Sequence, residues 1–115
     1  MARENEFVAH VRDLLAPFGD GAEYLRIRAM FGGQGVFLGD TMFALIADDV
    51  LYFKVDDRTL ADFQDAGSEP FTYSRGGKDR QMSYYAAPDG ALEETETLYP
   101  WAQRAIGAAR RSRKR

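Results

Sequence analysis

An apolar segment between two turn signals constrains the fold of this chain more than any other feature. Residues 42–47 are all apolar, and they lie between the pair Gly39 and Asp40 and the pair Asp48 and Asp49. Short glycine- or aspartate-bearing pairs of this kind are typical of tight hairpin turns. The sequence therefore predicts a three-stranded antiparallel meander with strands near residues 36–38, 41–47 and 50–55.

The middle strand of this meander is apolar on both faces. Side chains alternate between the faces of a strand, so Phe43 and Leu45 should share one face while Met42, Ala44 and Ile46 share the other. The chain's own helices can cover one face. The other face needs a further helix, a folded-back segment or a second copy of the chain, which favours a homodimer or a partner protein.

Apolar periodicity predicts helices at both ends of the chain. Apolar residues from position 7 to position 18 recur at spacings of one, three and four, as on one stripe of a helix with Asn5 as its N-cap. Pro17 and Gly19 should end this helix. The most regular amphipathic stripe belongs to a final helix that starts near Thr95 or Thr97, with Pro100 in or close to its first turn.

The segments between these helices complete an α+β pattern. Residues 23–29 alternate loosely and form either a short edge strand or an extended lead into the glycines that follow. Asp56 or Asp57 should cap a short helix that ends at Gly67, and a third hairpin should pair residues 71–75 with residues 81–86. The expected fold is two-layered, with an antiparallel sheet and the order α-β-β-β-α-β-β-α.

Length and composition exclude several classes of protein. A chain of 115 residues forms one domain with its own core, and its lack of cysteine excludes disulfides, thiolate catalysis and cysteine-based zinc sites. Charged residues interrupt the start of the chain, so neither a signal peptide nor a transmembrane segment is expected. These features fit a cytoplasmic protein.

Charge is distributed unevenly along the chain. Removing the five positive residues at the C-terminal end from the net charge of −3 leaves −8 for residues 1–109. An acidic body repels the nucleic-acid backbone, so DNA contact is expected only at a local patch or at a basic tail, residues 110–115. The tail is most simply a solvated helix end, and its phosphate-binding candidates are Arg110, Arg111, Arg113, Lys114 and Arg115.

Several blocks of sequence closely resemble the N-terminal domain of the TfoX/Sxy family. The first block contains Arg28, Met30, Phe31, Gly32, Gly33 and Gly35. Further blocks follow in the same order at residues 42–47, 51–55, 66–73, 82–84 and 101–111. The resemblance spans nearly the whole chain, and several separate blocks in the right order make a chance match improbable.

The resemblance implies a two-layer α+β domain similar to the folds of secretion chaperones, in agreement with the expected order of elements. Named members of the family regulate competence for DNA uptake as transcriptional coactivators beside a cyclic-AMP receptor protein, and they have no known catalytic activity. The resemblance therefore implies a regulatory role, a partner in the transcription machinery and no cofactor. The full regulators carry a second, C-terminal domain, whereas this sequence stops at Arg115.

The glycine cluster offers a candidate site for a small anion. Gly32, Gly33 and Gly35 could form a nest of backbone amides, with Arg28 supplying charge. A phosphate loop normally opens a helix, however, and here a strand follows. The simpler interpretation is that these glycines permit positive φ angles in a tight turn into the sheet.

Evidence for catalysis or metal binding is weak. Ser83 is a candidate nucleophile or ligand-binding residue, but the single histidine, His10, lies on the first helix, where a base for Ser83 is not expected. An enzymatic hypothesis would need a cleft at Arg28, Gly33 and Ser83. The paired aspartates at positions 48–49 and 56–57 suit turns and caps better than a metal site, so no metal is expected.

The strands also supply candidate contact residues. Met42, Ala44, Ile46, Tyr52 and Tyr84 are candidates for protein contact. The alternative is base stacking by strand tyrosines beside basic residues, and its members are Tyr52, Tyr73, Tyr84, Tyr85, Lys54 and Arg75.

The leading hypothesis is a non-catalytic domain, residues 1–109, that regulates transcription through protein contact. The alternatives are a nucleic-acid module that uses the basic tail and a small-anion site at the glycines.

Overall fold

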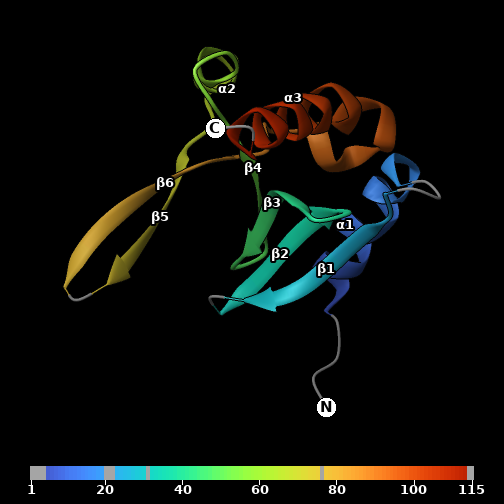
Figure 1. The fold of residues 1–115 in the computed structure, drawn as a ribbon, viewed down its shortest axis with the longest axis horizontal. Helices are drawn as coiled ribbons and strands as arrows, with labels where there is room; N and C mark the ends of the chain where they lie inside the picture. The colour runs from blue at the N-terminus through green and yellow to red at the C-terminus, as the bar shows by residue number, and fades with distance from the viewer. Residues whose placement is uncertain (1–4, 20–22, 31, 76, 114–115) are drawn as a thin grey trace.

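The computed structural model describes the backbone of residues 5–19, 23–30, 32–75 and 77–113, and the side chains in these ranges except those of residues 73–75 and 78–82. Within this part of the chain, helices flank six strands (Figure 1). The elements are α1 Glu6–Leu15, η1 Ala16–Phe18, β1 Leu25–Met30, β2 Gly33–Leu38, β3 Thr41–Ala47, β4 Val50–Lys54, α2 Leu60–Asp65, β5 Pro70–Arg75, β6 Lys78–Ala86, η2 Ala91–Glu93 and α3 Thr95–Arg113.

The strands form one antiparallel sheet in the order β1-β2-β3-β4-β6-β5. The α+β class, the meander and the third hairpin are confirmed. The loosely alternating segment at residues 23–29 contains the edge strand β1. β4 pairs with β6 rather than β5, so the connection through α2 carries the chain to the far edge of the sheet.

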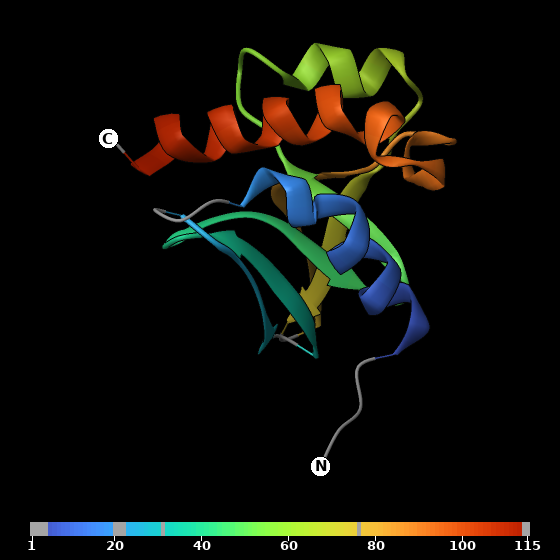
Figure 2. The ribbon, with the colours of Figure 1, turned by 90° about the vertical axis from the view of Figure 1, so that its right-hand side faces the viewer.

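Helices α1 and α3 pack on the same face of this sheet (Figure 2). α3 crosses β3 and β4, and α1 packs against α3 and β1. The predicted N-cap of α1 is confirmed, because the Asn5 side chain accepts a hydrogen bond of 2.8 Å from the backbone N–H of Val8. Phe63 of α2 extends the core, with its ring 6.4 Å from that of Phe53 and 4.9 Å from that of Trp101.

A β-bulge at Phe43 changes the predicted assignment of side chains to faces. Val36 pairs with Ala44 and Phe37 with Met42, so Phe43 is an extra residue in β3. A bulge lets two consecutive side chains point to one side of a sheet. Phe43 therefore joins Ala44 in the core beneath the helices, and the prediction that Phe43 shares a face with Leu45 is wrong.

The opposite face of β3 is covered within the single chain. Leu45 points away from the helices and is only 4% exposed. Met30 of β1 and Phe71 of β5 line one small hollow together with Leu45, although β1 and β5 are opposite edges of the sheet. The sheet therefore curls, and of the predicted alternatives the folded-back segment covers Leu45 without a second copy of the chain.

The turns on either side of β3 are those that the sequence predicts. Asp48 and Asp49 have φ angles of 50° and 59°, and Gly39 has a φ of 60°. Positive φ at both central residues is the requirement of a type I′ hairpin turn. The Asp48 and Asp49 pair thus serves the turn.

Gly32 and Gly33, where the chain passes from β1 into β2, are favoured for different reasons. Gly32 has a φ of +77° and open space around it, as the sequence predicts. Gly33 lies in strand β2, where an added Cβ would overlap the carbonyl oxygen of Ile46 on β3. Gly35 is likewise a strand residue, and its nearest neighbours would be side chains such as Met30. Positive φ therefore explains only the first of the three glycines.

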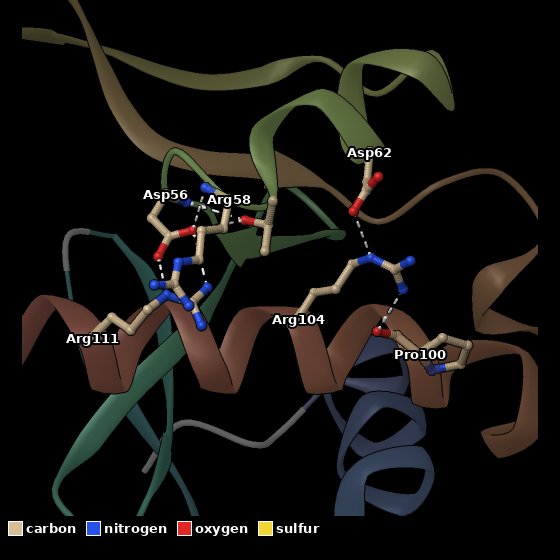
Figure 3. Close-up of polar contacts among 7 residues, drawn as sticks. Asp56, Arg58, Asp62, Pro100, Arg104 and Arg111 are labelled. Atoms are coloured by element: carbon tan, nitrogen blue, oxygen red, sulfur yellow. Dashed lines mark hydrogen bonds and ion pairs between the residues drawn. The ribbon is translucent and has the colours of Figure 1, made fainter.

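Arginines on α3 fasten the helix to distant parts of the chain. Arg104 and Arg111 lie seven residues, about two helical turns, apart and so point the same way (Figure 3). Arg104 Nε donates to Asp62 Oδ2 over 2.9 Å, and Arg111 holds both oxygens of Asp56 over 2.5 and 3.1 Å. These contacts hold α2 and the loop before it against α3.

The predicted solvated helix end makes similar contacts. Arg110 Nη2 lies 2.6 Å from Glu23 Oε1, and Arg113 Nη1 donates to Thr41 Oγ1 over 2.9 Å.

α3 begins at Thr95, so Pro100 lies beyond the first turn. The helix nevertheless continues through Arg113.

The contact between Arg111 and Asp56 should contribute to stability in a pH-dependent way. Hydrogen bonding to Arg111 holds the pKa of Asp56 below its ordinary value of 3.8, although burial acts in the opposite direction. A carboxylate with a lowered folded-state pKa stabilises the fold above its unfolded pKa, and this contribution is lost as the pH falls through the folded-state pKa. We expect Arg111→Gln to lower the free energy of unfolding by about 1 kcal/mol near neutral pH.

Urea unfolding at about pH 7 and about pH 3 measures this effect. The difference between wild type and Arg111→Gln should shrink at the lower pH, and Asp56→Asn should remove most of the additional effect of Arg111→Gln. Equal destabilisation at both pH values would show that the arginine acts through packing alone.

The two glycines should respond differently to the same substitution. Asparagine tolerates positive φ, so Gly32→Asn should change the free energy of unfolding by less than about 1 kcal/mol. Gly33→Asn should cost about 2 kcal/mol or more, because its Cβ meets the backbone of β3. Urea unfolding of both variants tests this, and similar losses would contradict the close approach at Gly33.

Candidate functional site

The sheet face opposite the helices carries basic and aromatic side chains. Strand register places Arg28 beside Gly35, Gly35 beside Leu45 and Leu45 beside Tyr52, so all of these residues share one face. Arg26 and Lys54 lie two residues from Arg28 and Tyr52 and therefore share it too. We call this surface the open face. Its residues with exposed side-chain surface are Arg26, Arg28, Met30, Phe37, Met42, Tyr52 and Lys54, whereas Leu45 and Tyr84 are buried within it.

Cations lie over aromatic rings on the open face. The Cζ atoms of Arg26 and Arg28 lie 5.6 and 5.8 Å from the centroid of Phe37, and Nζ of Lys54 lies 5.4 Å from that of Tyr84. Strands β1 to β4 contain these three cations and no carboxylate. Arg26 Nη2 lies 3.7 Å from Asp40 Oδ1 in the turn after β2, so Arg28 and Lys54 contribute most of the positive charge of this part of the sheet, in a chain whose net charge is −3.

The predicted platform of tyrosines is not assembled on one surface. Tyr84 is 7% exposed, and burial raises its pKa to about 12. Tyr85 pairs with Phe53 and packs against the helix side of the sheet. Tyr52 makes an edge contact with Phe71 at 4.9 Å between centroids, and burial, followed by the charges of Asp48 and Glu69, raises its pKa. The side chains of Tyr73 and Arg75 lie outside the described residues.

A polar cavity of about 430 Å³ lies beside the C-terminal end of α3. Lys54 ends β4, Arg58 belongs to the loop before α2, and Arg111 belongs to α3. Ser83 and Ser112 add hydroxyl groups to the same lining. The structure thus joins Ser83 and Arg111, which the sequence placed in two separate candidate sites.

The structure places the three residues that the enzymatic hypothesis needs in one cleft at three different sites. Arg28 lies on the open face, Gly33 lines the hollow near Met30, and Ser83 lines the polar cavity. His10 is elsewhere, with Nε2 2.9 Å from the carbonyl oxygen of Leu92.

The candidate residues for protein contact divide between the two sides of the sheet. Ala44 and Ile46 are buried in the core beneath the helices, which removes them from any surface of the folded chain. Met42 and Tyr52 lie on the open face and are partly exposed. The surface candidates are therefore those on the side away from α1 and α3.

The basic tail residues face the chain's own polar groups. Arg110 pairs with Glu23, Arg111 with Asp56, and Arg113 donates to Thr41. Lys114 and Arg115 lie outside the described residues. Three of the five phosphate-binding candidates thus have intramolecular partners.

Sequence reasoning missed Arg26, Phe37 and Arg58. The alternation of Arg26 and Arg28 with Leu25 and Ile27 was a usable signal, because it puts both arginines on one face of a strand. Nothing in the sequence indicated that Arg58 would meet α3, since that contact depends on the fold.

In the part of the chain that the structure describes, no group of three or more acidic or histidine side chains is placed to hold a metal ion. None of the helices there is long and apolar enough to cross a membrane.

Comparison with known proteins relates this chain to one named protein and to one family of domains. The chain is 29% identical over 86 residues to the "DNA transformation protein TfoX1" of Aliivibrio fischeri (strain ATCC 700601 / ES114). The match covers 75% of this chain and 41% of that protein, so the chain spans about two fifths of its relative's length. The sequence model of the TfoX N-terminal domain matches residues 13–109. The chain therefore belongs to the family of TfoX N-terminal domains.

Proposed function

We propose that this chain is a non-catalytic domain that regulates DNA transformation by binding an acidic partner protein through the open face. The family relation supports the link to DNA transformation, since the matched relative is named for that process. We propose more specifically that the chain acts in the cytoplasm and controls transcription.

The observation that carries this proposal is the one-sided placement of the strand cations. Arg26, Arg28 and Lys54 all lie on the face that α1 and α3 leave uncovered, and no strand from β1 to β4 contains a carboxylate. Phe37 and Met42 lie between them and are partly exposed. Apolar and aromatic groups with a cationic rim suit a protein surface of opposite charge.

The positions of the candidate catalytic and DNA-binding residues also fit a role in protein contact. Ser83 and His10 lie on different parts of the molecule, which supports a role without nucleophilic catalysis. The guanidinium groups of Arg110 and Arg111 are held by Glu23 and Asp56, which leaves less charge at the end of α3 for DNA.

Transformation assays with charge variants test the proposal. Deleting the gene from its host should change the frequency of DNA transformation, and the wild-type gene should restore it. Arg28→Glu should restore it about tenfold less well, because a carboxylate on the open face repels an acidic partner.

Two controls separate charge on the open face from other effects. Arg28→Lys keeps the positive charge, and Gln103→Glu adds a negative charge on exposed α3 surface, so both should function like the wild type. Thermal unfolding should show that all variants fold. An unchanged transformation frequency in the deletion strain would contradict the regulatory role, and full function of Arg28→Glu would contradict the open face as the binding surface.

A further inference from the structure

The polar cavity has the composition of an anion site. Three cations line it, and they come from three separate segments of the chain: Lys54, Arg58 and Arg111. Figure 3 shows the side chains of Arg58 and Arg111 near the Asp56 carboxylate. Convergence of like charges is unfavourable unless an anion compensates for it.

Asp56 compensates for only part of this charge. Both of its oxygens are held by Arg111, and Oδ1 also accepts hydrogen bonds from the backbone N–H of Arg58 at 3.0 Å and the Thr59 hydroxyl at 3.4 Å. Its hydrogen-bonding capacity is therefore largely used. Among the described residues no carboxylate pairs with the Arg58 guanidinium, and Asp57 is the other carboxylate in the lining.

The remaining groups match a phosphate that carries an organic substituent. Guanidinium and ammonium groups together with hydroxyl donors such as Ser83 and Ser112 are typical partners of phosphate oxygens. The carboxylate of Asp57 can accept hydrogen bonds from hydroxyl groups of the same ligand. The volume of about 430 Å³ lies in the range of small-molecule pockets and exceeds what a bare phosphate fills.

We propose that this cavity binds a small phosphate monoester that carries hydroxyl groups. Arg58 and Lys54 contact the phosphate, Ser83 and Ser112 donate to it, and Arg111 remains in place on Asp56 as a positioning residue. This site is distinct from the partner surface proposed above, and Lys54 is the one residue that borders both.

Titration with ribose 5-phosphate, followed by the amide resonances of the ¹⁵N-labelled full chain, tests the site. We expect saturable shifts concentrated at Val55, Arg58, Ser83 and Ser112. Ribose, which lacks the phosphate, should produce none. Arg58→Gln should weaken binding about tenfold, as expected for the loss of a charge-assisted hydrogen bond.

Arg28→Gln is the matched control, because it removes the same charge from the open face and leaves the cavity intact. Its affinity for ribose 5-phosphate should stay within about twofold of the wild type. If Arg28→Gln and Arg58→Gln weaken binding equally, the loss of affinity comes from the overall charge of the protein and not from the cavity. That result would overturn the proposal.

A single-stranded thymidine oligonucleotide distinguishes the source of the phosphate. If the oligonucleotide shifts the amide resonances of the cavity and ribose 5-phosphate does not, the site binds a nucleic-acid backbone and the monoester proposal is wrong. Absence of shifts with either probe also overturns it. None of these results bears on the transformation phenotype of Arg28→Glu, so the two proposals fail independently.

Discussion

The packing of α3 across β3 and β4 is the constraint on which the rest of the structure depends. Phe43 and Phe53 beneath this helix and Leu98 on its inner side have no exposed surface, and full burial of each such side chain contributes about 1.5–3 kcal/mol. The bulge at Phe43 increases the apolar surface that β3 gives to the helices, because two consecutive residues, Phe43 and Ala44, face them. Since one face of the sheet is committed to the helices, the charged side chains of β1 to β4, Arg26, Arg28 and Lys54, lie on the other. The open face is thus a consequence of how the core forms.

The length of α3 has a second consequence for charge. The helix extends to Arg113, and its arginines reach carboxylates that lie far away in the sequence, such as Glu23 and Asp56. These pairs are partly exposed, so each is individually weak, but together the three pairs attach α2, the loop before it and the segment before β1 to one helix. The basic C-terminal segment therefore acts as part of the fold through Arg113. Its charge in the sequence overstates the charge available to a partner.

The sequence predicted the features that depend on neighbouring residues. The hairpin turns follow from Gly39 and the aspartates at positions 48 and 49, and the start of α1 follows from the Asn5 cap. The bulge at Phe43 could not be predicted, because alternation in an apolar strand gives no sign of an inserted residue. The polar cavity was equally hidden, since Arg58 and Arg111 are brought together only by α2 packing on α3. The net charge of the chain was a poor guide to the charge of this surface. The chain is acidic overall, but the alternation of side chains along the strands puts its strand cations on one face of the sheet.

Lys54 relates the two proposed sites without merging them. Its ammonium group lies over the ring of Tyr84, and the residue is also part of the lining of the polar cavity. An anion bound in the cavity would lower the positive potential around Lys54 and so weaken the attraction of that end of the open face for an acidic surface. Arg26 and Arg28 gather instead around Phe37, at the β1 edge of the sheet, where the loss of potential is smaller because coulombic effects fall with distance. The geometry therefore allows a ligand to adjust the strength of partner binding while Arg28 keeps its own contribution.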